Sequence, residues 1–250
     1  MKKLTSIIVM ALVASSNNLF AQNTPVKTET DLWSLVASDV ARIDGKTMTR
    51  DELAKAFAAQ FPDNQVPAQV TQSQIVSLAP QFLRQHIQRI LLIDLAKADG
   101  VNIDPGTAVE LLKKEWSSLP DVQSEALKTE LEARKKTLDE YAKELAANQM
   151  VLDSLMIKSW IDQKLKSGIQ ITDQEIKKFY DDNKAQFQSA EGKVPELTEM
   201  TPQLRSYLEN QKLQQLLTQK LTETEKNRKV EYLLALPSRG FGGCGSGGCQ

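Results

Sequence analysis

The stretch ITDQEIKKFYDDNKAQF, residues 171–187, decides how the rest of this chain is organised. Thr172 and Glu175 have the spacing of a capping box, in which each side chain accepts a backbone N–H at the start of a helix. Phe179 and Tyr180 follow, and Phe187 comes after a polar run. The segment predicts a capped helix with an aromatic face, so the residues beyond it determine which kind of protein this is.

Length and composition are those of an ordinary globular protein. The chain has 250 residues, of which 41% are hydrophobic and 25% charged, enough for one sizeable core with or without a small satellite. Its 31 basic and 32 acidic residues give a net charge of −1. A surface of mixed sign lacks the clustered basic face that nucleic-acid binding requires, so we expect no nucleic-acid partner.

The first 21 residues have the pattern of a secretory signal peptide. Lys2 and Lys3 precede an apolar run at 7–14, and Leu19-Phe20-Ala21 forms a cleavage site. The run is shorter than the ~20 residues that a membrane span needs. We therefore expect cleavage, export to the periplasm or beyond, no membrane span in the mature chain, and a flexible polar lead at residues 22–36.

Helix signals dominate the rest of the chain. Residues 40–43 alternate like a short strand, Asp44-Gly45 is a turn, and residues 46–48 lead to a helix opened by Thr49 and Glu52. A central helix is expected over 72–98, regular from about Pro80. Asp104 and Pro105 open the next helix, Thr137 opens a long one to Lys166, and Thr201-Pro202 opens the last, which precedes a strand at 229–233. The expected fold class is mostly α.

Two phrases carry a family resemblance. ITDQEIKKFY (171–180) and LLIDLAKADGVNID (91–104) resemble segments of the SurA and PrsA group of extracytoplasmic folding factors. The resemblance implies one chaperone module over residues 37–236. Its segments 172–187 and 194–236 form the helices and the strand that bring the chain back to the start of the module. It also implies that the C-terminal strand pairs with residues 40–43, giving a two-stranded antiparallel ribbon.

The chain departs from that family after Phe187. Where the family carries a parvulin prolyl-isomerase domain of about 100 residues, the size of a small independent domain, only residues 188–193 precede the closing segment. Parvulins are expected to use paired histidines, whereas this chain has only His86, interpreted as structural. We therefore expect no enzyme activity, cofactor or metal. A residual prolyl isomerase and a dedicated assembly scaffold for one envelope partner stay open as alternatives.

The expected function is ATP-independent holding of unfolded or extended segments of exported proteins, outer-membrane proteins included. Flexible thioethers and flat rings adapt to varied side chains, so six residues are candidates for a peptide-binding groove, with simple core packing as the alternative reading. The candidates for the groove are Trp116, Met150, Met156, Trp160, Phe179 and Tyr180. Whether the chain forms a dimer stays open.

The C-terminal segment 237–250 is rich in glycine and contains both cysteines, Cys244 and Cys249. Glycine makes a small disulfide ring sterically easy, and an oxidising compartment favours it. A disordered tail that links chains through disulfides is an alternative. Metal binding ranks lower, because two thiolates fill half of a tetrahedral site.

Overall fold

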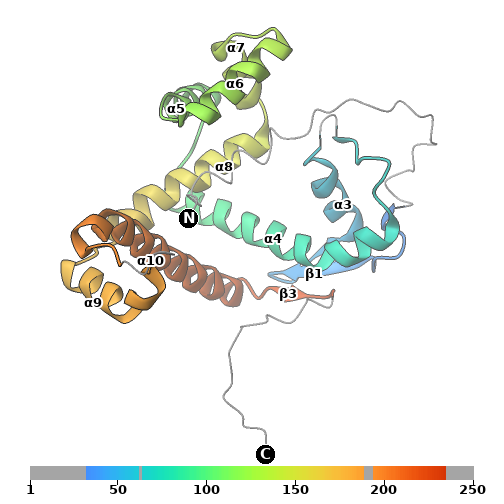
Figure 1. Cartoon of the computed structure of the whole chain (residues 1–250). Coiled ribbons are helices and arrows are strands. Elements are labelled where there is room, and N and C mark those ends of the chain that lie inside the picture. Colours follow the sequence, from blue (N-terminus) through green and yellow to red (C-terminus); the bar gives the residue numbers. More distant parts are fainter. Residues whose placement is uncertain (1–31, 62–63, 189–193, 235–250) are drawn as a thin grey trace, which may run out of the picture. The chain divides into compact units, whose positions relative to one another are not determined.

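The computed structural model describes residues 32–61, 64–188 and 194–234, which form a mostly α-helical protein with one small sheet (Figure 1). These residues divide into two compact units, one spanning 91–223 and the other combining residues up to 90 with residues from 224 onward. The boundaries fall inside two long helices, α4 (Gln72–Ala98) and α10 (Leu197–Asn227). The expectation that residues 37–236 form one chaperone module stays a prediction.

Several expectations concern residues outside these ranges and stay predictions. They are the signal peptide at 1–21, most of the lead at 22–36, the connector at 189–193, and the tail at 237–250 with Cys244 and Cys249.

The sheet belongs to the unit that contains both ends of the described chain. Its strands are β1 (Asp39–Ile43), β2 (Lys46–Thr49) and β3 (Glu231–Tyr232), in the antiparallel order β2–β1–β3. The expected pairing of the C-terminal strand with the N-terminal strand is confirmed. The expectation of only two strands is wrong, because Asp44 and Gly45 adopt φ values of 52° and 81°, which a tight hairpin turn requires, and so return the chain as β2.

Aromatic rings fill the core of this unit. Thr49 and Glu52 form the expected capping box at the start of α3 (Arg50–Ala58). The Phe57 ring makes edge contacts with Trp33 at 5.7 Å and with Phe82 at 5.2 Å between centroids. The largest fully buried side chains of the unit are Trp33, Val40, Leu53, Ile75, Leu83 and Ile87.

Helix α4 begins earlier than the position of Pro80 predicts. The side chain of Thr71 accepts the N–H of Gln74, and the Gln74 amide oxygen accepts the N–H of Thr71 at 2.8 Å. This is a capping box in which glutamine, rather than glutamate, is the third residue of the helix. It starts α4 at Gln72 and leaves Pro80 inside the helix.

The other unit contains α5 (Pro105–Ser117), α6 (Asp121–Arg134), α7 (Leu138–Ala146) and α8 (Gln149–Trp160). Asp104 caps α5 as expected, accepting the N–H groups of Gly106 and Thr107. The single long helix expected over 137–166 is wrong. Asn148 caps a new helix by accepting the N–H of Met150 at 2.8 Å, so α7 and α8 are separate. Beyond Trp160 the chain widens into a π-helical turn, Ile161–Leu165.

Helices α9 (Asp173–Asn183) and α10 lie side by side (Figure 1). The capping box of Thr172 and Glu175 is confirmed, and a 3₁₀ turn, Lys184–Phe187, follows α9. Helix α10 starts before Thr201 because the Glu196 carbonyl already accepts the N–H groups of Glu199 and Met200. Pro202 therefore lies inside α10.

No helix among the described residues is both long and apolar enough to cross a membrane.

Candidate functional site: an aromatic surface on α9 and α10

The six candidate peptide-binding residues do not form one groove. Met156, Trp160 and Tyr180 are buried, whereas Trp116, Met150 and Phe179 are half-buried. They also belong to different hydrophobic clusters, since Trp116 packs with α5, α7 and α8, and Phe179 with α9 and α10. Peptide binding by these six residues stays a prediction, but it cannot take the form of a single shared surface.

Met156 and Trp160 are core residues of the unit. They pack with Ala96 and Val101, and only 1% of Trp160 is exposed. The indole Nε1–H of Trp160 donates to Oδ2 of Asp99 at 2.7 Å, so the polar edge of the ring is satisfied. This hydrogen bond joins the end of α8 to the end of α4.

Trp116 lies on the rim of another core. Its ring stacks on Tyr141 at 5.8 Å between centroids and 13° between planes. The guanidinium of Arg134 lies 5.3 Å from the centroid of the Tyr141 ring. The stack fixes α5 on α7 and leaves Trp116 partly open.

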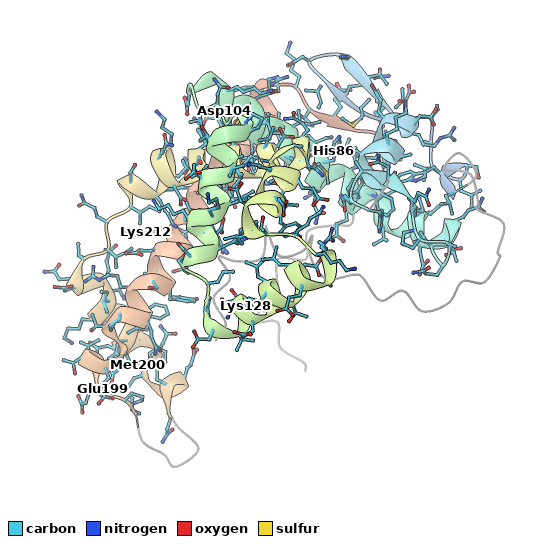
Figure 2. All side chains as sticks on the ribbon, turned by 90° about the horizontal axis from the view of Figure 1, so that it is seen from above. His86, Asp104, Lys128, Glu199, Met200 and Lys212 are labelled. Carbon is cyan, nitrogen blue, oxygen red and sulfur yellow. The ribbon has the colours of Figure 1, made fainter. Side chains whose placement is uncertain are left out.

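The remaining candidate, Phe179, belongs to a more open group of side chains. Its ring lies 5.1 Å from Tyr207 and 6.4 Å from Phe187, measured between centroids. Tyr207 is 47% exposed, and Phe187 and Met200 are half-buried beside the same cluster. We call Phe179, Phe187, Met200 and Tyr207 the aromatic surface. Figure 2 labels Met200 at the start of α10.

A layer of buried side chains lies beneath the aromatic surface. The Tyr180 hydroxyl donates to the carbonyl of Pro195 at 2.6 Å, and its ring stacks on Phe187 at 5.8 Å. Ile171, Ile176 and Leu204 are buried with Tyr180. Because Tyr180 is fixed at both its ring and its hydroxyl, it holds the segment before α10 against α9.

Ion pairs also join α9 and the residues before it to α10. Glu175 accepts from Lys212 at 2.7 Å, and this bond, with the capping bonds to Thr172, lowers the pKa of Glu175 from 4.5 to about 2. Arg205 donates to Asp173 and to the carbonyl of Ile171, each at 2.6 Å. These bonds keep the two helices that carry the aromatic surface in register.

A second candidate site, a pocket, lies between α5 and α8. Leu111 and Leu155 form the apolar part of a pocket of about 360 Å³. Charged and polar side chains line the remainder, namely Lys114, Glu115, Ser118, Lys158, Ser159, Asp162 and Gln163. Asp162 lies in the π-helical turn and pairs with Lys158 and Lys166. A volume of this size lies within the range of small-molecule sites, but only two of the lining residues are apolar.

Tyr207 and Met200 were missed by sequence reasoning. The leucines of the last helix differ in exposure, since Leu204 is buried and Leu216 is 40% exposed. Met200 and Tyr207 are seven residues apart, two helical turns, so they share a face of α10. That spacing is visible in the sequence, but the contact between Tyr207 and Phe179 on α9 depends on the fold.

His86 lies on α4 and its ring stacks on Phe82 at 6.0 Å between centroids. Burial lowers its pKa from 6.5, with a further contribution from the positive charge of Arg89. The residue is half-buried against the aromatic core.

Within the described ranges, no group of three or more His, Cys, Asp or Glu side chains is arranged to hold a metal ion.

No protein-family model, curated protein or solved structure matches this chain. The likeness to the SurA and PrsA group thus stays an interpretation of the sequence.

Proposed function

We propose that this protein is an ATP-independent chaperone that holds unfolded or extended segments of exported proteins outside the cytoplasm, without catalysis. The observation that carries the proposal is the aromatic surface of Phe179, Phe187, Met200 and Tyr207. Aromatic rings and a thioether left partly open on a charged protein offer contact area to varied apolar side chains.

The shape of the candidate sites suits this task. The aromatic surface is partly open, and the pocket between α5 and α8 is lined mostly by polar and charged residues. A holdase must bind many sequences and release them, so several weak, shallow contacts serve it better than one deep pocket. Catalytic chemistry has no comparable support, because the single histidine of the chain is half-buried against Phe82.

The proposed location rests on the sequence. The charged start and apolar run of residues 1–21 are typical of a signal peptide. The order of segments resembling the SurA and PrsA group adds support, with the parvulin domain replaced by a short connector. Outer-membrane proteins and other exported chains are the expected clients.

Site-specific crosslinking in the native compartment tests the proposal. A photoreactive phenylalanine analogue replaces Tyr207 in one variant and Leu216 in the control. Leu216 is 40% exposed on the same helix but lies on the opposite side by the helical repeat. We expect many exported proteins to be captured from position 207 and few from 216. One stoichiometric partner would instead support the scaffold alternative, and equal capture at both positions would contradict a specific surface.

A further inference from the structure

Two carboxylates that pair with no described residue adjoin the aromatic surface. Glu196, Glu199, Met200 and Tyr207 fall within about 100° of one another around the helix axis at 3.6 residues per turn. Glu196 precedes α10, but its carbonyl already accepts helical hydrogen bonds. Figure 2 places Glu199 next to Met200 at this end of α10. The acidic side chains therefore share a face of α10 with Met200 and Tyr207.

The other charges of α9 and the facing part of α10 are mostly neutralised. Ion pairs join Asp173 to Arg205, Glu175 to Lys212, Lys177 to Asp181 and Lys178 to Asp182. The Lys184 ammonium lies over the Tyr180 ring and pairs with no carboxylate of the described residues, so it keeps its positive charge. Among the described residues, Glu196 and Glu199 have no such partner, and both are exposed. Two carboxylates against the one ammonium of Lys184 make the uncompensated charge around the aromatic surface negative on balance.

We propose that the aromatic surface selects extended segments in which an apolar side chain is flanked by Lys or Arg. The apolar side chain contacts Phe179 and Tyr207, while the neighbouring cation is attracted by Glu196 and Glu199 and by the face of the Tyr207 ring. This inference rests on the proposed holdase function and adds the charge of the preferred client segment. Exposed charges act through water, so the preference must weaken with salt.

The two carboxylates also have a purely structural reading. Acidic residues at the start of a helix stabilise it through the helix dipole. Loss of stability in a variant would therefore say nothing about clients. Only a change in the preference between peptides of different charge separates the two readings.

The test uses three fluorescent peptides with one apolar core, flanked by lysine, by glutamine or by glutamate. Their dissociation constants are measured by anisotropy with the full chain, with a Glu196→Gln/Glu199→Gln variant and with a Glu223→Gln control. Glu223 is exposed on α10 and, within the described residues, also unpaired. Circular dichroism confirms that each variant is folded at the temperature used.

We expect the lysine-flanked peptide to bind about three- to tenfold more tightly than the glutamine-flanked one, the effect of one or two exposed ion pairs. The preference should vanish in the double variant and at high salt, and persist in Glu223→Gln. Equal binding of all three peptides, or a preference that survives in the double variant, would overturn the inference while the holdase stands. Failure of every peptide to bind would overturn both.

A second copy of the chain is the other conceivable occupant of the surface. In that case sedimentation would show a dimer for the natural chain at the working concentration. The Tyr207→Ser variant would sediment as a monomer. That outcome would also overturn the inference.

Discussion

The indole nitrogen of Trp160 donates a 2.7 Å hydrogen bond to the carboxylate of Asp99, 61 residues earlier in the chain. Trp160 is 1% exposed, so Asp99 satisfies a donor that water cannot easily reach. The bond joins the ends of α8 and α4 around the cluster of Ala96, Val101 and Met156. It is a polar contact at the edge of an otherwise apolar cluster.

Removing the carboxylate should therefore destabilise the fold. We expect Asp99→Ala to lower the free energy of unfolding by about 1–3 kcal/mol, because the indole N–H is left without an acceptor. Urea unfolding followed by circular dichroism measures the change. A double-mutant cycle with Trp160→Phe is the control. If Asp99→Ala costs as much in the Trp160→Phe background as in the natural chain, the hydrogen bond contributes nothing.

The capping boxes offer a second prediction. Thr137 and Thr172 each cap a helix through a side-chain oxygen, so Thr137→Ala and Thr172→Ala should each cost about 1 kcal/mol in unfolding free energy. Thr129 is the matched control, because its hydroxyl bonds back to the Glu125 carbonyl inside α6. Thr129→Ala should be neutral or slightly stabilising. Thermal melts of the three variants make the comparison, and equal losses would refute the capping account.

Glu175 supplies a pH prediction. Its pKa is lowered from 4.5 to about 2 in the folded state, chiefly by Lys212, so the unfolded chain takes up the proton first as pH falls. The stabilisation is full above pH 4.5 and is lost as pH falls towards 2. A glutamine at the same position keeps a capping box but loses the charge.

Melting temperatures of the natural chain and of Glu175→Gln should therefore differ at neutral pH and converge towards pH 2. Lys212→Met provides the reciprocal control, since in that background the Glu175→Gln substitution should change the melting temperature less at neutral pH. A difference that is constant across this pH range would contradict the assigned ion pair.

His86 acts in a different pH window. Burial against Phe82 lowers its pKa below 6.5, so protonation favours the unfolded chain. Stability should fall as pH drops below 6.5. His86→Gln should remove this dependence between pH 6.5 and about 5, above the range in which carboxylates titrate. Chemical unfolding across that window measures it, and parallel curves for the two proteins would show that His86 is not the group responsible.

Local signals account for the parts of the fold that the sequence predicted well. The capping boxes at Thr49, Thr137 and Thr172 involve residues three apart, so their geometry depends little on the rest of the chain. The Asp44-Gly45 turn is local in the same way. Asn148 was overlooked because the apolar stripe continues on both sides of it, although its side chain starts a new helix.

The candidate site was harder to predict because it depends on how α9 meets α10. Phe179 was identified, but Tyr207 lies 28 residues later and only the folded hairpin brings the two rings to 5.1 Å. The helical periodicity of apolar residues does not predict which aromatic side chains are exposed. Trp160 is buried and Phe179 is half-buried. Both lie on apolar helical faces, and the difference comes from which neighbours cover them.

Suppression of aggregation tests the central claim most directly. A denatured outer-membrane protein is diluted into buffer without ATP, and its light scattering is followed with the natural chain, Tyr207→Ser or Leu216→Ser. The account predicts that the natural chain and Leu216→Ser slow aggregation, whereas Tyr207→Ser protects much less. Scattering that rises equally fast with and without the natural chain would contradict the holdase, and equal protection by Tyr207→Ser would contradict the aromatic surface as its site.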